Sequence, residues 1–393
     1  HGRLLLLGLE QDDHLATATQ PVTQLALPER RRDVGSEAIG EQPGHECQDP
    51  GVDVVGLGQL AGSVGEGASL PWVDPCDPQA GIAAGFEQWL LVAAGGLDHD
   101  TGPEHAERPE RLAAVIEALQ AAFPDLDLRQ APAATRGQLL RVHDESLLAT
   151  VLESQPTGRI PLDADTVLSP GSALAALHAA GAGVAAVDLV FGGDARRAFC
   201  AVRPPGHHAT RDIAMGFCLF NSIAVAAAHA LDRYGLTRVS IVDFDVHHGN
   251  GTQAIFEAEP RVQYLSSHQW PLYPDTGHRS ERGVGNIVNL PLPPGTGSEA
   301  FRAAWHERLL PEIDAFAPQL VLVSAGFDAH RRDPLAQLEL DAVDFGWITG
   351  ELVALADRHA EGRLVSMLEG GYDLQALREC SVAHLRSLRA TPA

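Results

Sequence analysis

Apolar residues recur at the spacing of buried helix faces in several parts of the chain after residue 85. Between about residues 107 and 122 they fall at positions i, i+3, i+4 and i+7, which places them on one stripe: Leu112, Val115, Ile116 and Leu119. Similar patterns predict helices at about 171–190, 221–234, 298–315 and 341–359. Each of these helices is long enough to cover part of a sheet.

Four short apolar runs alternate with these helices. They are AFCAV at 198–202, VSIVDFDV at 239–246, LVLVSAG at 320–326 and LVSML at 364–368. Strands that alternate with helices are typical of a mostly parallel sheet with helices on both faces, so we predict an α/β fold. Every run leads into polar or glycine-rich residues, and ligands in such folds bind beyond the carboxyl ends of the strands. We therefore expect the chemistry at these four ends.

The first 85 residues follow a different pattern. They are rich in Gly, Pro, Gln and Asp and show no sustained helical or strand period. We expect residues 1–85 to be a disordered or non-native extension without a catalytic role. Residues 86–393 are predicted to form one catalytic domain.

Composition narrows the class of partner. The chain has 393 residues and a formal net charge of −24, which would repel nucleic-acid phosphates but suits a cationic substrate. Its five cysteines form no CxxC pair, and an odd number is a poor disulfide framework, so we expect a reducing, cytoplasmic location. No apolar stretch in the sequence reaches membrane-spanning length, so we predict no membrane association.

Charged residues interrupt the second apolar run. Strand alternation would place Asp243, Asp245 and His247 on one face, where a buried central strand normally carries apolar side chains. Buried carboxylates need partners or a cation, and Asp328, just after the third run, could reach the same point. Two carboxylates and one imidazole leave coordination positions for water and substrate, which is typical of a catalytic zinc. We predict Asp245, His247 and Asp328 as metal ligands.

Two further groups follow other runs. The loop RPPGHHA after the first run carries adjacent His207 and His208 on a bend made rigid by prolines, and histidine has the near-neutral pKa that a general base requires. The last run leads through Gly370 and Gly371 to Tyr372, and paired glycines permit a tight bend that would turn the phenol toward the site. We predict that both histidines and the tyrosine are catalytic.

Four motifs taken together, RPPGHHA, DFDVHHGNGTQ, SAGFDAHRRDPL and LEGGYDL, resemble the histone deacetylase family, which includes bacterial deacetylases and acetylpolyamine amidohydrolases. The likeness spans about residues 90–390. It extends to LDHDTGPEHAERPERL at 97–112, where Glu104 and Ala106 replace the Gly and Pro usual in the family. The resemblance implies an arginase-like α/β fold with an eight-stranded, mostly parallel sheet and helices on both faces. It also implies hydrolysis of acetyl-lysine-type amides to acetate and a free amine.

The resemblance assigns metal ions to this site. It implies one zinc ion (Zn²⁺) per chain, bound by Asp245, His247 and Asp328, and a monovalent cation, usually potassium (K⁺), near it. The residues implied for the monovalent cation are Asp243, Asp245, His247 and Ser266. Asp243 would also orient His207.

The same resemblance implies a mechanism. His208, steered by Asn250, would take a proton from the attacking water and later give one to the leaving amine, while His207 gives electrostatic support. The Tyr372 hydroxyl would stabilise the oxyanion. The HHGNG sequence, with Asn250 where other members have Asp, resembles the class II branch.

Residues that would contact the substrate also come from the resemblance. Phe217 and Tyr273 match the two aromatic walls of the family's substrate tunnel, and we place Gly216 beside them. Leu335 occupies the position where polyamine-specialised relatives carry a glutamate, which favours acetylated lysine peptides or proteins over acetylated small amines. Arg111 matches the arginine near the family's internal product channel.

Three alternatives remain. An acetylpolyamine or other small acylamine amidohydrolase would share the chemistry but not the substrate. An arginase-type enzyme would need extra carboxylates for a second metal ion, and Gly249 and Gly326 stand where they would be expected. A non-catalytic acyl-ligand sensor would keep the pocket, but the complete set of catalytic residue types favours an enzyme.

Overall fold

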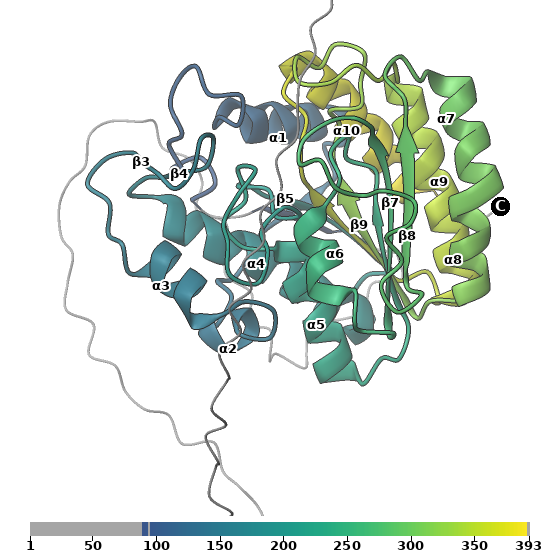
Figure 1. Ribbon diagram of the computed structural model, residues 1–393, viewed down its shortest axis with the longest axis horizontal. Coiled ribbons are helices and arrows are strands. Elements are labelled where there is room, and N and C mark those ends of the chain that lie inside the picture. Colours follow the sequence, from purple (N-terminus) through teal and green to yellow (C-terminus); the bar gives the residue numbers. More distant parts are fainter. Residues whose placement is uncertain (1–88, 93–94, 391–393) are drawn as a thin grey trace, which may run out of the picture. The chain divides into compact units, whose positions relative to one another are not determined.

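The computed structural model describes residues 89–92 and 95–390, which all belong to one of two compact units of the chain, Ala80–Ala393 (Figure 1). The extension predicted for residues 1–85 lies outside the described residues. The predicted domain, from residue 86 onward, contains every element considered below.

One sheet of eight parallel strands forms the centre of the described part. Its spatial order is β2-β1-β5-β10-β9-β6-β7-β8, and each neighbouring pair runs parallel. The strands are β1 (Trp89–Val92), β2 (Asp127–Gln130), β5 (Arg197–Ala201), β6 (Val239–Asp243), β7 (Val262–Gln269), β8 (Ile287–Leu292), β9 (Leu320–Ala325) and β10 (Leu364–Leu368). A small antiparallel pair, β3 (Ile160–Pro161) and β4 (Val167–Leu168), lies outside it. The predicted α/β fold is confirmed.

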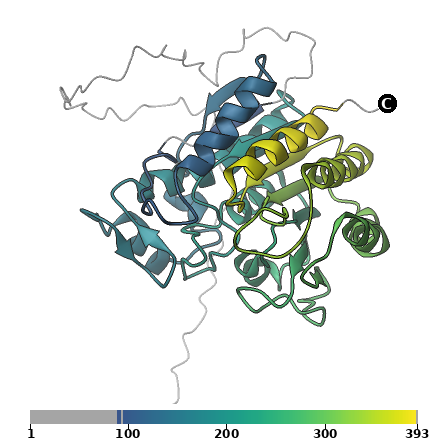
Figure 2. The same cartoon turned by 90° about the horizontal axis from the view of Figure 1, so that it is seen from above.

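Helices cover both faces of the sheet. They are α1 (Glu110–Ala122), α2 (Arg136–Leu139), α3 (Glu145–Leu152), α4 (Ser172–Gly192), α5 (Ser222–Tyr234), α6 (Asn250–Phe256), α7 (Ser298–Ala304), α8 (Leu310–Phe316), α9 (Ala342–His359) and α10 (Leu374–Leu388). Seen from above, α1 and α10 lie side by side although they come from opposite ends of the described chain (Figure 2).

The two-residue period of the strands divides the core into two layers. Ala198 and Cys200 of β5 pack in one hydrophobic cluster with α4 and α5. Phe199 and Ala201 of the same strand pack in a second cluster with α1, α9 and α10. Because successive side chains of a strand point to opposite faces, a strand covered on both faces is mostly apolar, as residues 198–201 of β5 are.

The five predicted helices are present, with shifted ends. The helix predicted from residue 107 begins at Glu110, and Pro109, which lacks a backbone N–H, is its N-cap. The stretch predicted as one helix at 298–315 is α7 and α8 joined by a π-helical turn at Trp305–Leu309. Pro311 follows this turn closely and removes one donor from the regular helical ladder.

The strand predicted at 239–246 ends earlier than its apolar pattern suggests. β6 stops at Asp243, so the expectation that alternation alone places Asp245 and His247 on its face is wrong. The cause is local hydrogen bonding: the Asp245 amide donates to Asp243 Oδ1 at 3.1 Å, and the His247 amide donates to Asp245 Oδ1 at 2.9 Å. Such side-chain to backbone bonds compete with a strand ladder and turn the chain.

The expectation that no apolar stretch reaches membrane-spanning length is wrong for helix α4, the one described helix that is long and apolar enough to cross a membrane by length and composition. Its most apolar window is 61% buried, and the helix contacts β5 and β10. Burial of this kind is typical of a helix that packs on a sheet.

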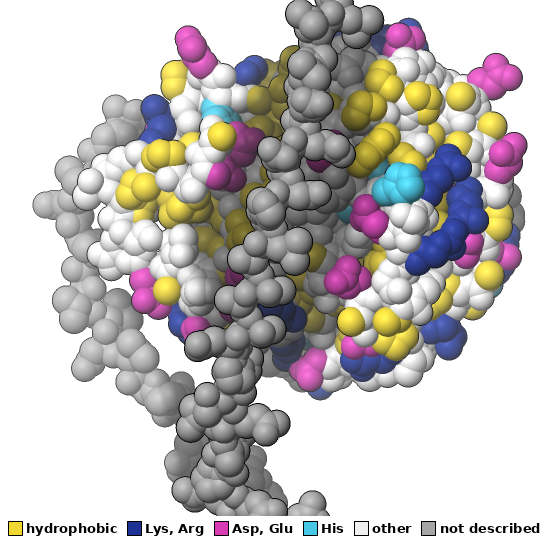
Figure 3. Space-filling view, in the orientation of Figure 1, with side chains coloured by type: hydrophobic (Ala, Val, Ile, Leu, Met, Phe, Trp, Pro, Cys, Tyr) yellow, Lys and Arg dark blue, Asp and Glu magenta, His cyan; other side chains and the backbone are white. Residues whose placement is uncertain are grey.

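Charged side chains are spread over the surface. On the described part of the face in Figure 3, acidic side chains occur both at the outline and in the middle, and basic side chains form separate groups. The sequence contains no lysine, so the basic groups coloured dark blue are all arginines.

Candidate active site

The strand order brings four strand ends together. β9 and β10, the last strands in the sequence, lie between β6 and β5. The carboxyl ends of β5, β10, β9 and β6 are therefore neighbours at the same end of the sheet. The loops after these ends carry the predicted chemical residues: His207, His208, Asp245, His247, Asp328 and Tyr372. The sheet therefore gathers residues that are up to 165 positions apart in the sequence, from 207 to 372.

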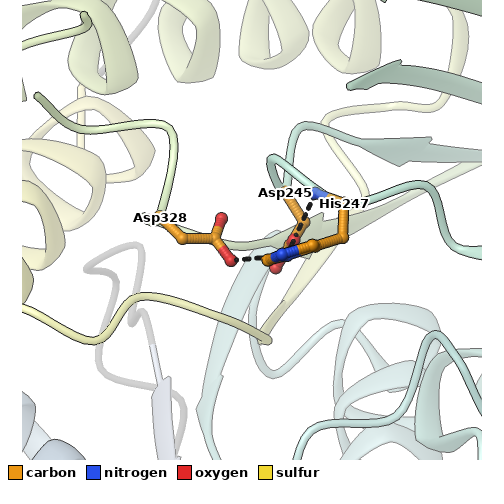
Figure 4. Close-up of side chains that lie close together, drawn as sticks. All are labelled: Asp245, His247 and Asp328. Carbon is orange, nitrogen blue, oxygen red and sulfur yellow. Dashed lines mark hydrogen bonds and ion pairs between the residues drawn. The ribbon is translucent and has the colours of Figure 1, made fainter. Parts of the chain in front are cut away.

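Asp245, His247 and Asp328 point toward one another (Figure 4). His247 Nδ1 lies 3.1 Å from Asp245 Oδ1 and 3.2 Å from Asp328 Oδ2. One ligand atom from each residue lies within 4.8 Å of the others. Within residues 89–92 and 95–390, this is the one group of three or more His, Cys, Asp or Glu side chains with the geometry of a metal site. All three side chains are buried.

Burial of two carboxylates in one place demands positive charge. Burial, followed by the negative charge of Asp245, raises the pKa of Asp328 to about 6. Burial lowers the pKa of His247, but hydrogen bonds with both carboxylates outweigh it and raise that pKa to about 10. When no cation lies between them, the two carboxylates favour the charged imidazole, which must lose a proton to bind a metal ion. A divalent cation would neutralise the two carboxylates more strongly than a protonated imidazole does.

Backbone amides hold the two carboxylates in place around this point. Asp245 Oδ2 accepts a hydrogen bond from the Gly370 amide at 2.8 Å, and Asp328 Oδ1 accepts one from the Val246 amide at 2.8 Å. A Cβ atom on Gly370 would lie 2.1 Å from Asp328 Oδ2 and 2.5 Å from Asp245 Oδ2. Only glycine lets the backbone approach both carboxylates so closely. Two carboxylates and one imidazole match the mixed nitrogen and oxygen ligands that zinc accepts.

The residues expected around a monovalent cation lie beside this trio. Asp243 is paired in register with Ser266 of β7, and both are buried. Asp243 Oδ2 lies 3.0 Å from His207 Nδ1 and accepts a hydrogen bond from the Tyr264 hydroxyl at 3.0 Å. Ser266 Oγ lies 2.9 Å from His268 Nδ1, so its hydroxyl is directed along its own strand rather than at Asp243. Asp243 thus contacts His207 directly, and its role in orienting that histidine stays a prediction.

His207 and His208 are adjacent and differ in charge state. Their ring centroids are 4.0 Å apart. Burial lowers the pKa of His207, but Asp243 and Asp245 outweigh it and raise that pKa to about 10. Burial, and then the positive charges of His207 and His247, lower the pKa of His208 well below its usual value. Two titratable groups driven apart in this way suit one cationic and one basic role.

Asn250 fixes the tautomer of His208. Its Oδ1 atom lies 2.8 Å from His208 Nδ1. An amide oxygen only accepts hydrogen bonds, so Nδ1 carries the proton and Nε2 keeps its lone pair. Gly216 lies against the same ring: a Cβ atom there would be 2.5 Å from His208 Cδ2, and its φ of +56° favours glycine. Besides the predicted substrate contact, Gly216 thus has a second reason to be glycine.

Tyr372 is buried at the same strand ends and remains protonated. Burial raises the pKa of its phenol well above 10, although Arg111 opposes the shift. The Arg111 guanidinium lies 4.8 Å from the ring centroid, and it donates to the Gly371 carbonyl at 2.5 Å and to the Glu369 carbonyl at 2.6 Å. Arg111 therefore holds the backbone of the turn that carries the phenol. A neutral phenol can donate a hydrogen bond to an oxyanion.

The residues expected to contact substrate lie on both sides of these groups. The Phe217 ring centroid is 5.7 Å from that of Tyr372, and the Tyr273 centroid is 5.2 Å from that of His208. Tyr273 is 39% exposed, so its side chain reaches the surface. Leu335 is half-buried in the loop that follows Asp328.

Several site contacts were not predicted from the sequence. The Glu369 carboxylate accepts hydrogen bonds from the Gly206 amide at 2.6 Å and the Ser324 hydroxyl at 3.0 Å, which ties the histidine loop to β9. Glu107, buried and paired with Arg111 and Arg203, anchors the segment before α1. In the sequence, Glu369 and Glu107 are recognisable only as charged residues next to a predicted strand or helix end. Such a position does not reveal which residue each of them binds.

Comparisons with known proteins assign this arrangement to a family. Residues 105–388 match the model of the histone deacetylase domain. The chain is 40% identical over 316 residues to the histone deacetylase-like amidohydrolase of Pseudomonas aeruginosa, covering 78% of this chain and 82% of that protein. It is 39% identical over 305 residues to the human polyamine deacetylase HDAC10, covering 73% of this chain and 45% of that protein.

A solved structure shows the same relationship. The crystal structure of the HDA15 HD domain superposes with a TM-score of 0.71 at 35% sequence identity, covering 76% of this chain and 90% of that one. The matched family model spans well over half of the chain. The chain therefore belongs to the histone deacetylase family and is a hydrolytic enzyme of the deacetylase and amidohydrolase type.

Proposed function

We propose that the chain is a zinc-dependent hydrolase that releases acetate and a free amine from acetyl-lysine-type amides. The observation that carries this proposal is that three groups converge at the buried carboxyl ends of the central strands. They are the metal trio (Asp245, His247 and Asp328), the His207–His208 pair and the Tyr372 phenol. One zinc ion per chain would be held by Asp245, His247 and Asp328, and would supply Lewis-acid activation of the amide carbonyl and of a water molecule.

The histidine pair would move the protons. His208, neutral and with Nε2 free, is the general base that takes a proton from the attacking water. His207, charged and held by Asp243, provides positive charge beside the reacting atoms. Once protonated, His208 gives the proton to the leaving amine. The carboxylates of Asp243 and Asp245, which lie near His207, offset the positive charge of the histidine pair.

Tyr372 would stabilise the oxyanion. Its hydroxyl stays protonated because burial raises the pKa of the phenol well above 10. Arg111 holds the turn that carries it, so the donor is in place before the reaction begins. A donor fixed in advance costs no reorganisation when the negative charge develops.

The substrate is proposed from the two aromatic residues Phe217 and Tyr273 and from Leu335, which lies in the loop after Asp328, here called the rim loop. Phe217 and Tyr273 would enclose the methylene stem of an acetylated lysine, and Leu335 offers no charge to a second amine. The net charge of −24 favours cationic peptides and proteins over nucleic acids. Acetylated polyamines are the second candidate, because the relative HDAC10 is named as a polyamine deacetylase. We further propose K⁺ beside Asp243, whose buried carboxylate lies next to the zinc trio.

The test is acetate release from an acetyl-lysine peptide by the zinc-loaded protein, with Tyr372→Phe as the paired variant. Loss of one oxyanion donor should lower kcat about 100- to 1,000-fold. Acetylspermidine, assayed in parallel, separates the two substrate classes. A folded, zinc-loaded protein that binds acetyl-lysine but hydrolyses neither substrate would contradict the proposal and favour a sensor. Two metal ions per chain would instead favour the arginase-type alternative.

A further inference from the structure

Asp333 is a buried carboxylate that joins two loops of the site. It lies five positions after Asp328, and 7% of the residue is exposed. Its Oδ2 atom accepts a hydrogen bond from the backbone amide of Tyr372 at 2.8 Å. Its Oδ1 atom accepts one from the backbone amide of Leu335 at 3.0 Å. The same side chain therefore binds the residue with the phenol and the residue at the rim.

The turn that precedes Tyr372 needs such an anchor. Gly370 and Gly371 come directly before it, and Gly371 has a φ of +115°, a conformation that costs other residues energy. Glycines also leave the backbone more conformational freedom, which must be removed to fix the following side chain. Arg111 binds the Gly371 carbonyl from one side, and Asp333 binds the Tyr372 amide from the other. The Arg111 guanidinium is charged, and hydrogen bonds with a charged partner are stronger and shorter than neutral ones.

We infer that Asp333 is a positioning residue for the Tyr372 hydroxyl and couples it to the rim loop that carries Leu335. This inference rests on the proposed oxyanion role of Tyr372. Asp333 does not touch the reacting atoms. It acts by fixing the backbone on which the phenol is carried, so that the donor and the rim keep one arrangement.

A double-mutant cycle tests this coupling. Asp333→Ala should lower kcat about 10- to 100-fold with little change in KM, because a misplacement of about 1 Å in a catalytic group has costs of this size. In the Tyr372→Phe background the same substitution should lower kcat less than about 3-fold, since the hydroxyl it positions is already absent. Asp333→Asn, which keeps the side-chain shape, provides the same comparison if the alanine variant does not fold.

A matched control separates positioning from general stability. Asp344 is fully buried and accepts a hydrogen bond from the Asp341 amide at 3.0 Å, but it lies at the start of α9 and pairs with Arg302. Asp344→Asn should lower the melting temperature and leave kcat per folded, zinc-loaded molecule unchanged. An equal loss of kcat for Asp333→Ala in the unmodified protein and in the Tyr372→Phe variant would overturn the inference.

Hydrogen exchange gives a readout that does not depend on activity. The amides of Tyr372 and Leu335 should exchange faster in Asp333→Asn than in the unmodified protein, while exchange in α10 stays the same. Unchanged exchange at Tyr372 would overturn the positioning role even if kcat fell. If the unmodified protein released no acetate, the proposed function would fail, and the exchange rates would still decide whether Asp333 holds the turn.

Discussion

Gly370 lies in close contact with the carboxylates of Asp245 and Asp328. A Cβ atom added to this glycine would lie 2.1 Å from Asp328 Oδ2, so there is no space for any side chain. Gly370→Ala should therefore displace both carboxylates and weaken zinc binding about 10- to 100-fold, as lost outer partners of metal ligands do. Calorimetric titration of the metal-free protein with zinc measures the effect.

A second glycine provides the control. Gly350 lies inside α9, and a Cβ atom there would meet nothing within 4 Å. Gly350→Ala should leave zinc affinity unchanged and stabilise the helix by up to about 1 kcal/mol. Equal zinc affinity for Gly370→Ala and the unmodified protein would show that the carboxylates need no such space.

At the residue scale, sequence reasoning identified the residue types of the site but not their partners. Asp245, His247 and Asp328 stood out because charges beside buried strands need compensation, and the structure brings them together. Their roles as zinc ligands stay a prediction. Asp333 and Glu369 carried the same signal. Asp333 binds Tyr372, which is 39 positions away, and Glu369 binds Gly206, which is 163 positions away. No local sequence pattern reveals partners at such distances.

At the element scale, the central strands were predictable and the outer ones were not. The four predicted runs correspond to β5, β6, β9 and β10, which are apolar on both faces because helices cover both. β7 contains Ser266, Ser267 and His268 in sequence, so its apolar pattern is broken although it is fully buried. The end of β6 was also missed, because carboxylates that bind their own backbone amides stop the ladder at Asp243.

Arg197 connects β5 to the last two helices. Its guanidinium donates to Asp357 of α9 at 2.7 Å and to the carbonyls of Leu388 and Ala390, at 2.9 and 2.7 Å, at the end of α10. Arg197→Met should lower the free energy of unfolding by about 3 kcal/mol, because it leaves a half-buried carboxylate and two carbonyls without this buried, charged partner. Urea denaturation measures the change.

An exposed arginine on the same helix as Asp357 is the control for this prediction. Arg358 pairs with Asp314 at the surface, and its side chain is 58% exposed. Arg358→Met should change the free energy of unfolding by less than about 1 kcal/mol. Similar losses for the two variants would mean that the Arg197 contacts contribute no more than a surface pair.

At the scale of the whole molecule, buried neutral histidines make stability depend on pH. Burial lowers the pKa of His99 and of His143 to about 4, and that of His384 to about 3. Unfolded chains bind protons at these histidines near pH 6.5, whereas the folded protein does not. Their contribution to stability is therefore complete above about pH 6.5 and is lost as the pH falls toward 4.

His384 allows this dependence to be measured at a single position. Its ring nitrogens lie 2.6 Å from Thr349 Oγ1 and 2.8 Å from Ser366 Oγ, between α9 and β10. His384→Gln removes the titration and keeps polar atoms, so the slope of unfolding free energy against pH should decrease by about 1.4 kcal/mol per pH unit between about pH 6 and 5. Equal slopes in the variant and in the unmodified protein would contradict the prediction.

The division between strand ends and rim loops also matters for engineering. The metal trio and the histidine pair follow central strands and are fixed by buried hydrogen bonds, whereas Tyr273 is 39% exposed and Leu335 is half-buried in a loop. A library that randomises Tyr273 and Leu335 could therefore sample new acyl groups and amines while each member keeps the same hydrolytic centre. Selection from such a library would search for specificity without having to rebuild the catalyst.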